Sequence, residues 1–172
     1  ASKVLLVLLC SAVGLAHAQS FPTKPVRVIT PFAAGSGPDS ALRLVSERLT
    51  RAWGQQVVVE NQGGAGGMIG SARVAKSPPD GYMVLLGGSA VLAQNQAIYK
   101  KPLVDGATDF TFVTIFADQA RILLTRKDFP ANTLVEFNAY AKANGAKMQY
   151  GSAGAGSGTH VCALLLDAVN GT

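Results

Sequence analysis

Two glycine-rich stretches of this 172-residue chain carry the residues best suited to bind a small ligand. The first reads PFAAGSGPDS (residues 31–40), and the second reads YGSAGAGSGTH (residues 150–160). Because glycine has no side chain, a ligand can approach the backbone N–H groups of such a stretch directly. A helix is expected to begin just after each stretch, and a helix start adds unpaired N–H donors and a partial positive charge. This chemistry suits a carboxylate or a phosphate.

Each stretch has a plainer explanation when it is taken alone, because a tight turn that needs positive φ also selects glycine. Two stretches of matching design, each between an expected strand and an expected helix, favour a binding site. Other glycine motifs are absent. The sequence has no Gly-x-x-x-x-Gly-Lys-Ser/Thr, and Ile69 stands where a dinucleotide-binding motif would need its third glycine. We therefore expect no cofactor.

Ser157 and His160 raise an alternative hypothesis, an exported hydrolase that uses a Ser–His pair. No serine lies in a Gly-x-Ser-x-Gly elbow, and neither an oxyanion loop nor a third catalytic residue can be assigned. We therefore expect a binding protein and no enzyme, with His160 as a polar neighbour of the helix start or of the ligand. At the other helix start, Asp39 or Ser40 is expected to be the N-cap, and Asp39 is expected to act as a cap rather than as a general acid.

The composition limits the partners of the protein. The net charge of +5 is scattered along the chain, and no basic stripe predicts nucleic-acid binding. After the expected signal peptide the chain holds one histidine and one cysteine, Cys162, so we expect neither a His/Cys metal site nor an intramolecular disulfide. Cys162 lies in an apolar helical run and is expected to be a buried structural thiol. The expected state is a monomer.

Residues 1–18 (ASKVLLVLLCSAVGLAHA) have the features of a secretory signal peptide. Lys3 precedes an apolar run from Val4 to Leu9, and Ala16-His17-Ala18 has the small-x-small form of a cleavage site. The apolar run is too short to span a bilayer as a stable helix. Cleavage after Ala18 would place the mature protein in the periplasm. The alternative is a buried N-terminal helix.

Alternating strand and helix patterns predict an α/β fold for the first part of the chain. Short β-branched or apolar runs at 26–30, 55–61 and 82–88 are expected strands. The segments 39–53 and 71–77 are expected helices, and Gly54 stands where the first of them needs a C-terminal cap. The order strand–helix–strand–helix–strand implies right-handed crossovers and a parallel sheet that is covered on both faces.

The second part of the chain is expected to start another sheet. Segments 109–117, 120–129 and 147–154 have strand character, and segments 134–145 and 159–171 have helical periodicity. The apolar face of the last helix has no partner in the sequence, so we expect a second unit that is C-terminally truncated. A non-functional fragment that cannot fold alone is therefore a further alternative.

These stretches together resemble the Bug family of tripartite tricarboxylate transporter substrate-binding proteins. The resemblance covers residues 21–172 and rests on Phe-Pro-x-Lys-Pro, Pro-Phe-Ala-Ala-Gly, Val-Glu-Asn with its glycine run, Ala-Lys-x-Pro-Pro-Asp-Gly-Tyr and YGSAGAGSGTH. It implies an α/β, periplasmic-binding-protein-like, two-lobed (Venus flytrap) architecture with parallel or mixed sheets. Residues 19–118 would form the first lobe without its C-terminal return segment, and residues 119–172 would begin an incomplete second lobe.

The resemblance also implies a function and a site. Such proteins capture a small carboxylate ligand between their lobes, largely through backbone amides, and deliver it to the membrane permease subunits of a transporter. The implied ligand-binding residues are Phe32, Ala34, Gly35, Ser36, Gly37 and Asp39 in the first loop, Gly88, Ser89 and Ala90 after the third strand, and Ser152, Ala153, Gly154, Gly156, Ser157, Thr159 and His160 in the second loop.

The first loop departs from the family pattern Gly-Gly-Gly-Thr-Asp, because this chain has Gly35-Ser36-Gly37-Pro38-Asp39. Ser36 would be strained if its position needs positive φ, and Pro38 removes one N–H donor and the hydroxyl of threonine. Both changes bear on ligand affinity and ligand choice. The sequence names neither the carboxylate nor the choice between transport and sensing.

Overall fold

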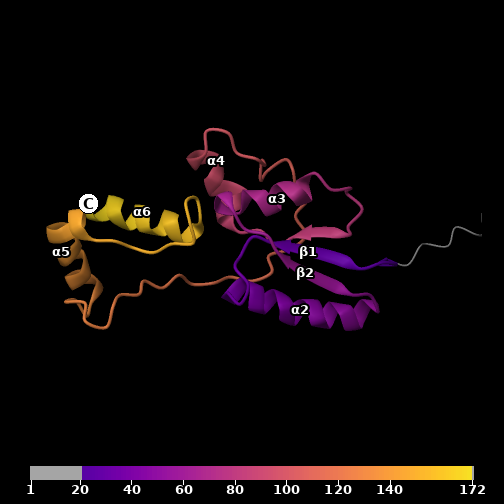
Figure 1. Cartoon of the computed structure of the whole chain (residues 1–172), viewed down its shortest axis with the longest axis horizontal. Coiled ribbons are helices and arrows are strands. Elements are labelled where there is room, and N and C mark those ends of the chain that lie inside the picture. The colour runs from indigo at the N-terminus through magenta and orange to yellow at the C-terminus, as the bar shows by residue number, and fades with distance from the viewer. Residues whose placement is uncertain (1–20, 172) are drawn as a thin grey trace, which may run out of the picture.

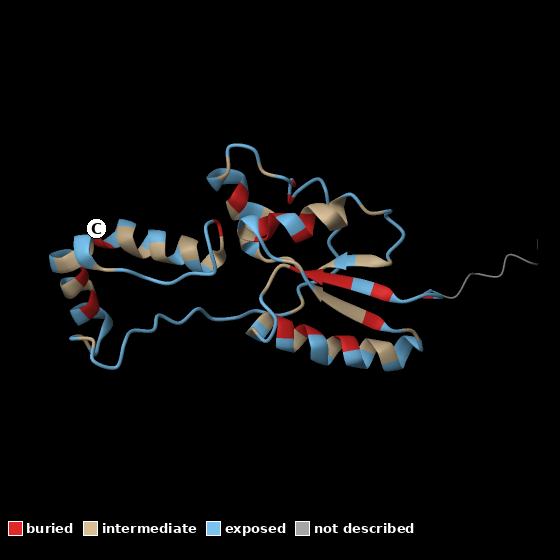
Figure 2. Ribbon diagram, in the orientation of Figure 1, coloured by how far each residue is buried: buried red, intermediate tan, exposed pale blue. Residues whose placement is uncertain are grey.

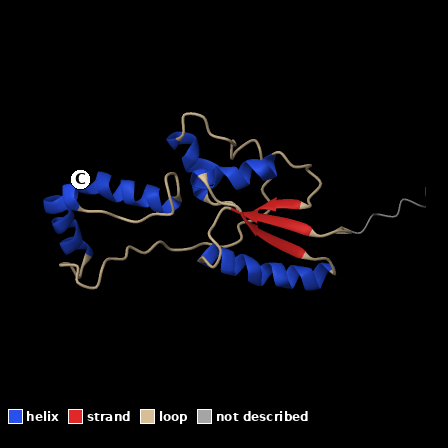
Figure 3. Cartoon of the chain, in the orientation of Figure 1, coloured by secondary structure: helices blue, strands red, loops and turns tan. Residues whose placement is uncertain are grey.

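The computed structural model of the protein describes residues 21–171 (Figure 1). The predicted signal peptide, residues 1–18, lies outside these residues. A three-stranded sheet with flanking helices forms a first unit, and a long connection leads from it to two further helices that form a second unit (Figures 1 and 3).

The sheet is parallel, with the strand order β2-β1-β3. The central strand β1 (Val26–Thr30) pairs with β2 (Val57–Asn61) on one side and with β3 (Met83–Leu85) on the other. Its β-branched side chains suit a strand that is covered on both faces, and Ile29 and Thr30 are fully buried. The predicted order strand–helix–strand–helix–strand is confirmed.

Helices α2 (Gly37–Trp53) and α3 (Met68–Ala75) lie on opposite sides of the sheet (Figure 1). α2 packs Leu42 into the hydrophobic core, and Gly54 ends the helix in a left-handed conformation with a φ of 65°, as predicted. α2 begins earlier than predicted, because its N-cap is Ser36 rather than Asp39 or Ser40. The physical reason is Pro38, whose fixed φ is compatible with the first helical turn.

Short helical turns complete the first unit. A 3₁₀ turn, η2, precedes α3, and a π-helical turn, η3, leads directly into the short helix α4 after β3. Their bounds are Ala65–Gly67 for η2, Ala90–Gln94 for η3 and Asn95–Ile98 for α4.

Three predicted strands are wrong for the part of the chain that the structure describes. Residues 110–126 run as an extended, largely exposed connection, and the segment 147–154 forms a turn and a loop (Figure 3). A strand is stable only when a neighbouring strand pairs with its N–H and C=O groups, and within residues 21–171 no strand lies beside these segments. Val113 and Ile115 are accordingly 87% and 90% exposed, whereas Phe116 packs against the core.

The second unit contains α5 (Leu134–Asn144), the 3₁₀ turn η4 (Gly145–Lys147) and α6 (Gly158–Asn170). A capping box starts α5, because Thr133 accepts the N–H of Glu136 and the Glu136 carboxylate accepts the N–H of Thr133. Phe137 is buried beside the ring of Phe129, 5.6 Å away between centroids.

Much of α6 is exposed (Figure 2). The prediction that Cys162 is buried is wrong, since its side chain is exposed where the apolar face of α6 has no cover from the residues described. Leu165 and Val169 on the same helix are exposed as well. Between residues 21 and 171, no helix combines the length and the hydrophobicity needed to cross a bilayer.

Candidate functional site

The predicted loops leave the sheet at the carboxyl ends of its strands. The loop after β1, the glycine run after β2 and Gly88-Ser89-Ala90 after β3 share one edge of the parallel sheet. The helices that follow β1 and β2 cover opposite faces, so this edge includes a topological switch point, where open α/β sheets bind ligands. Phe32 and Gly88 meet there, since a Cβ on Gly88 would lie 3.1 Å from Cζ of Phe32.

Asp39 holds the first loop in shape. Its side chain is 1% exposed, and its carboxylate accepts hydrogen bonds from Arg43 Nε (3.0 Å), Asn61 Nδ2 (2.7 Å) and the Gly35 N–H (2.8 Å). These three donors lower the pKa of Asp39 to about 2, and the hydrogen bond from Arg43 has the largest effect. Asn61 Nδ2 also donates to the C=O of Phe32 at 3.1 Å, which ties the loop to the end of β2. Asp39 therefore positions the loop, and its lone pairs are largely used by the protein.

The start of α2 leaves donors without a protein partner. The N–H of Ser36 donates to the C=O of Ala33 at 3.1 Å, and Pro38 has no N–H. The N–H groups of Gly37 and Asp39 donate to no acceptor among the residues described. The Oγ of Ser36 is buried and also unpaired there. Buried polar groups normally have a hydrogen-bond partner, so this helix start is suited to an anion or to the water that accompanies one.

The departures of the first loop from the family pattern cause no strain. Ser36 has a φ of −68° and a ψ of 163°, an extended conformation that any residue adopts. Pro38 lies in the first turn of α2, where a missing N–H breaks no helical hydrogen bond. The backbone path of the loop is therefore kept, and the departures cost one N–H donor and the hydroxyl that threonine has in the family pattern.

The second loop repeats the local design of the first. Residues 35–39 read Gly-Ser-Gly-Pro-Asp, and residues 156–160 read Gly-Ser-Gly-Thr-His. In each, the first glycine has positive φ (78° and 74°), the serine is the N-cap, and the second glycine begins the helix. In each, the fifth side chain accepts the N–H of the first glycine. His160 Nδ1 accepts from Gly156 at 3.3 Å, as Asp39 accepts from Gly35.

Several N–H groups of the second loop are used within the loop. Ala153 donates to Thr159 Oγ1 (3.0 Å), and Gly154 donates to Ser152 Oγ (3.3 Å). The N–H groups of Gly158 and Thr159 find no acceptor within residues 21–171. The donors available to a ligand therefore concentrate in the first turn of α6.

Ser157 and His160 are not arranged as a nucleophile and its base. Ser157 Oγ accepts the backbone N–H of His160 at 3.3 Å and lies 3.1 Å from Thr159 Oγ1. Nδ1 of His160 is occupied by the Gly156 N–H and cannot also accept a proton from Ser157. In the described part of the chain, no hydrogen bond joins the His160 ring to a carboxylate, which a catalytic triad requires. The hydrolase hypothesis gains no geometric support.

The structure brings the two helix starts to one connecting segment. Gln119 lies against the start of α2, where a Cβ on Gly37 would be 2.6 Å from Gln119 Nε2. Two residues later, the Arg121 guanidinium lies against Gly158 at the start of α6. Arg121 forms no ion pair with the acidic residues of the described chain. The N-termini of α2 and α6 therefore border a common region that also holds a positive charge (Figure 1).

The remaining predicted ligand residues flank this region. Ala34, Ser89, Ser152, Ala153 and Gly154 are exposed, whereas Phe32, Gly88 and Ala90 are half-buried. Sequence reasoning missed Gln119 and Arg121, because both lie in a part of the chain that was interpreted as a strand or its connection.

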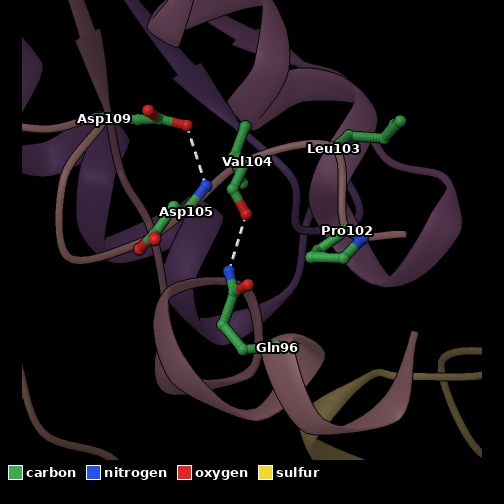
Figure 4. Close-up of a pocket in the computed structure, with 6 residues that line it drawn as sticks. All are labelled: Gln96, Pro102, Leu103, Val104, Asp105 and Asp109. Atoms are coloured by element: carbon green, nitrogen blue, oxygen red, sulfur yellow. Dashed lines mark hydrogen bonds between the residues drawn. The ribbon is translucent and has the colours of Figure 1, made fainter. Parts of the chain in front are cut away.

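Two surface hollows lie apart from this region. One, of about 230 Å³, is lined by residues that hydrogen bonds join, from Gln96 Nε2 to the C=O of Val104 (2.6 Å) and from the Asp105 N–H to Asp109 Oδ2 (2.8 Å; Figure 4). The other lies between α2 and β2. Neither is lined by a predicted ligand residue. Between residues 21 and 171, no three His, Cys, Asp or Glu side chains gather where they could hold a metal ion.

Comparisons with known proteins point to one family. The family described as "Tripartite tricarboxylate transporter family receptor" matches residues 41–172. Over 174 residues the chain is 37% identical to the "UPF0065 protein in the TAR-I ttuE-ttuC' intergenic region" of Agrobacterium vitis, an alignment that covers 99% of this chain and 50% of that protein. The chain thus spans about half the length of the curated relatives it matches.

Solved structures give the same result. A structure described as a periplasmic transporter matches with a TM-score of 0.83 and 38% identity, covering 88% of this chain and 51% of that one. MatC from Rhodopseudomonas palustris, solved with bound malate, matches with a TM-score of 0.79 and 33% identity, covering 88% of this chain and 52% of that one.

Proposed function

We propose, since this chain belongs to the tripartite tricarboxylate transporter receptor family, that the protein captures a small carboxylate for delivery to a membrane transporter. The family consists of binding proteins and not of enzymes. A dicarboxylate is the first candidate ligand, because the similar MatC structure holds malate. The partners are then the permease subunits of a tripartite transporter. The protein acts as a monomer in the periplasm, with residues 1–18 as its signal peptide.

One observation carries the proposal. Two helix starts with unpaired N–H groups, at Gly37 in α2 and at Gly158 in α6, border the same connecting segment. A dicarboxylate has two anionic ends, so each helix start can receive one of them. Arg121 adds a positive charge beside the second helix start, and the half-buried Phe32, whose ring lies against Gly88, offers an apolar surface at the same edge of the sheet. The two lobes, residues 19–118 and 119–172, would then close on the ligand.

The energies show why one loop is not enough. A hydrogen bond to a charged group contributes about 1.5–3 kcal/mol, and a helix N-terminus adds about 0.3–1 kcal/mol. Micromolar affinity needs about 8 kcal/mol, after the costs of ordering and desolvation. The two unpaired N–H groups at one helix start fall short of this value. Four such groups, two from each helix, together with both helix starts contribute about 6.6–14 kcal/mol, and the upper part of this range exceeds the value that micromolar affinity needs.

The test is direct binding to the full chain. Isothermal titration calorimetry with malate, succinate, citrate and acetate should give saturable 1:1 binding of at least one di- or tricarboxylate, with acetate much weaker. Absence of binding for all four, together with ester hydrolysis that is lost in His160→Ala, would support the hydrolase instead. A broad unfolding transition that no carboxylate shifts would support the fragment that cannot fold alone.

A further inference from the structure

Close contacts among five residues join the second glycine loop to the first unit. Gly66, Asn95 and Tyr99 belong to the first unit, and Ala155 and Gly156 belong to the loop. The hydroxyl of Tyr99 donates to the C=O of Ala155 at 3.0 Å. We call these five residues the docking contact.

Two glycine backbones approach closely in the docking contact. A Cβ on Gly66 would lie 3.1 Å from the carbonyl oxygen of Ala155 and from the carbonyl carbon of Gly156. A Cβ on Gly156 would lie 2.7 Å from both Asn95 Oδ1 and Tyr99 Cε2. Gly156 is buried, although its neighbours Gly154 and Ala155 are exposed. The loop therefore fits against the first unit because both glycine positions lack a side chain.

Asn95 forms the base of the docking contact on the first unit. Its side chain is fully buried, and its Nδ2 donates to the C=O of Gly66 at 3.1 Å. Its Oδ1 has no hydrogen-bond partner in the described chain and faces Gly156. An unpaired buried oxygen is costly, and the docked loop directs a Cα–H group of Gly156 toward this oxygen, since a Cβ on Gly156 would lie 2.7 Å from it. The amide is thus satisfied best when the loop is docked.

Other restraints on the loop are weak. The connection 110–126 has no sheet partner within residues 21–171, and much of α6 is exposed. The position of the α6 start relative to the α2 start therefore depends on the docking contact.

We propose that Asn95 and Tyr99 are positioning residues, which hold the second glycine loop on the first unit and thereby set the affinity for a carboxylate. This inference rests on the proposed function, since the affinity requires the N–H groups of Gly158 and Gly37 to face one ligand. Loss of the docking contact leaves these donors in place on their own helices but lets the two helix starts separate.

Tyr99→Phe tests the inference on the full chain, because it removes the hydroxyl and keeps the ring. One neutral hydrogen bond changes an equilibrium by a factor of about 3–10. The Gly156 amide, followed by NMR hydrogen exchange, should exchange about 3- to 10-fold faster, and the Kd for malate should rise by a similar factor. The thermal midpoint of the ligand-free chain should stay the same. Gly156→Ala should speed up the exchange of this amide further and should also raise the Kd for malate further.

Tyr140→Phe is the matched control. Tyr140 packs its ring on Phe129, 4.9 Å between centroids, and its hydroxyl has no hydrogen-bond partner among the residues described. Neither the exchange of Gly156 nor the Kd should change in this variant.

Each result decides the inference. Unchanged Gly156 exchange in Tyr99→Phe would overturn the docking contact, and faster exchange with an unchanged Kd would overturn its role in affinity. If the unaltered chain binds none of the carboxylates, the proposed function fails, and the exchange measurement still shows whether Tyr99 holds the loop.

Discussion

The backbone N–H of Gly158 offers the sharpest test of the proposed carboxylate site. Gly158 is the first residue of α6, is not in the positive-φ region, and follows Ser157, whose ψ of 156° suits the residue before a proline. Proline is well tolerated at the first helical position, where the N–H has no helical partner. Gly158→Pro therefore removes one donor from the helix start while the helix can still form.

The magnitude follows from the contact that is lost. A hydrogen bond from an N–H to a carboxylate contributes about 1.5–3 kcal/mol, so Gly158→Pro should raise the Kd for malate about 10- to 150-fold. Gly158→Ala keeps the N–H and is the matched control. Its Cβ meets the end of the Arg121 side chain, which is flexible and exposed and can move aside. Alanine adds a Cβ at the same place as proline does, so the control should raise the Kd much less than Gly158→Pro does.

Isothermal titration calorimetry gives both Kd values, and far-ultraviolet circular dichroism shows whether α6 is kept. Equal weakening in the proline and alanine variants would mean that crowding near Arg121 matters and the N–H does not. An unchanged Kd in Gly158→Pro would remove the start of α6 from the site.

Three further changes test the loops and the core. Asp39 has a lowered pKa, so it stabilises the fold above pH 3.8 and this contribution is lost as the pH falls toward about 2. In Asp39→Asn, the free energy of unfolding by urea should therefore depend less on pH between about 2 and 3.8. If the free energy of the variant changes with pH as steeply as that of the unaltered chain, Asp39 does not have this role. Leu42→Ala should lower the free energy of unfolding by about 2–5 kcal/mol, because Leu42 is buried in the core cluster. His160→Asp should keep the Gly156 exchange rate near that of the unaltered chain but weaken malate binding at least about tenfold, whereas His160→Ala should speed up the exchange.

The sequence was most informative where local chemistry decides the structure. The β-branched run of β1, the apolar spacing of α2 and the left-handed Gly54 were predictable, because each depends on neighbours within a few residues. The glycine loops were found for the same reason.

Prediction failed where the outcome depends on a distant partner. The segment 109–117 is rich in β-branched and aromatic residues, as strands are, but strand formation needs a neighbour, and none lies beside it in the described chain. Cys162 is exposed for a related reason, since the pattern of α6 marks an apolar face but cannot supply its cover. Asn95 and Tyr99 carried no signal, because their partners Gly66 and Ala155 lie 29 and 56 residues away.

The difference between Asp39 and His160, the last residues of the two matching loops, fits an anionic ligand. Asp39 places a negative charge beside the first helix start, but its carboxylate lies between Arg43, Asn61 and the Gly35 N–H, so its field toward the ligand is largely compensated. The second loop has no comparable ion pair. Arg121 lies against Gly158 and forms no ion pair with any acidic side chain of the described residues. An aspartate at residue 160 would bring a negative charge near that of the ligand carboxylate. Two like charges about 4 Å apart repel by about 4 kcal/mol at an effective dielectric constant of about 20, and this repulsion exceeds the gain from one charged hydrogen bond. The ring nitrogen of His160 accepts the Gly156 N–H and carries no carboxylate charge that would repel the ligand, and Arg121 stays available to attract a carboxylate.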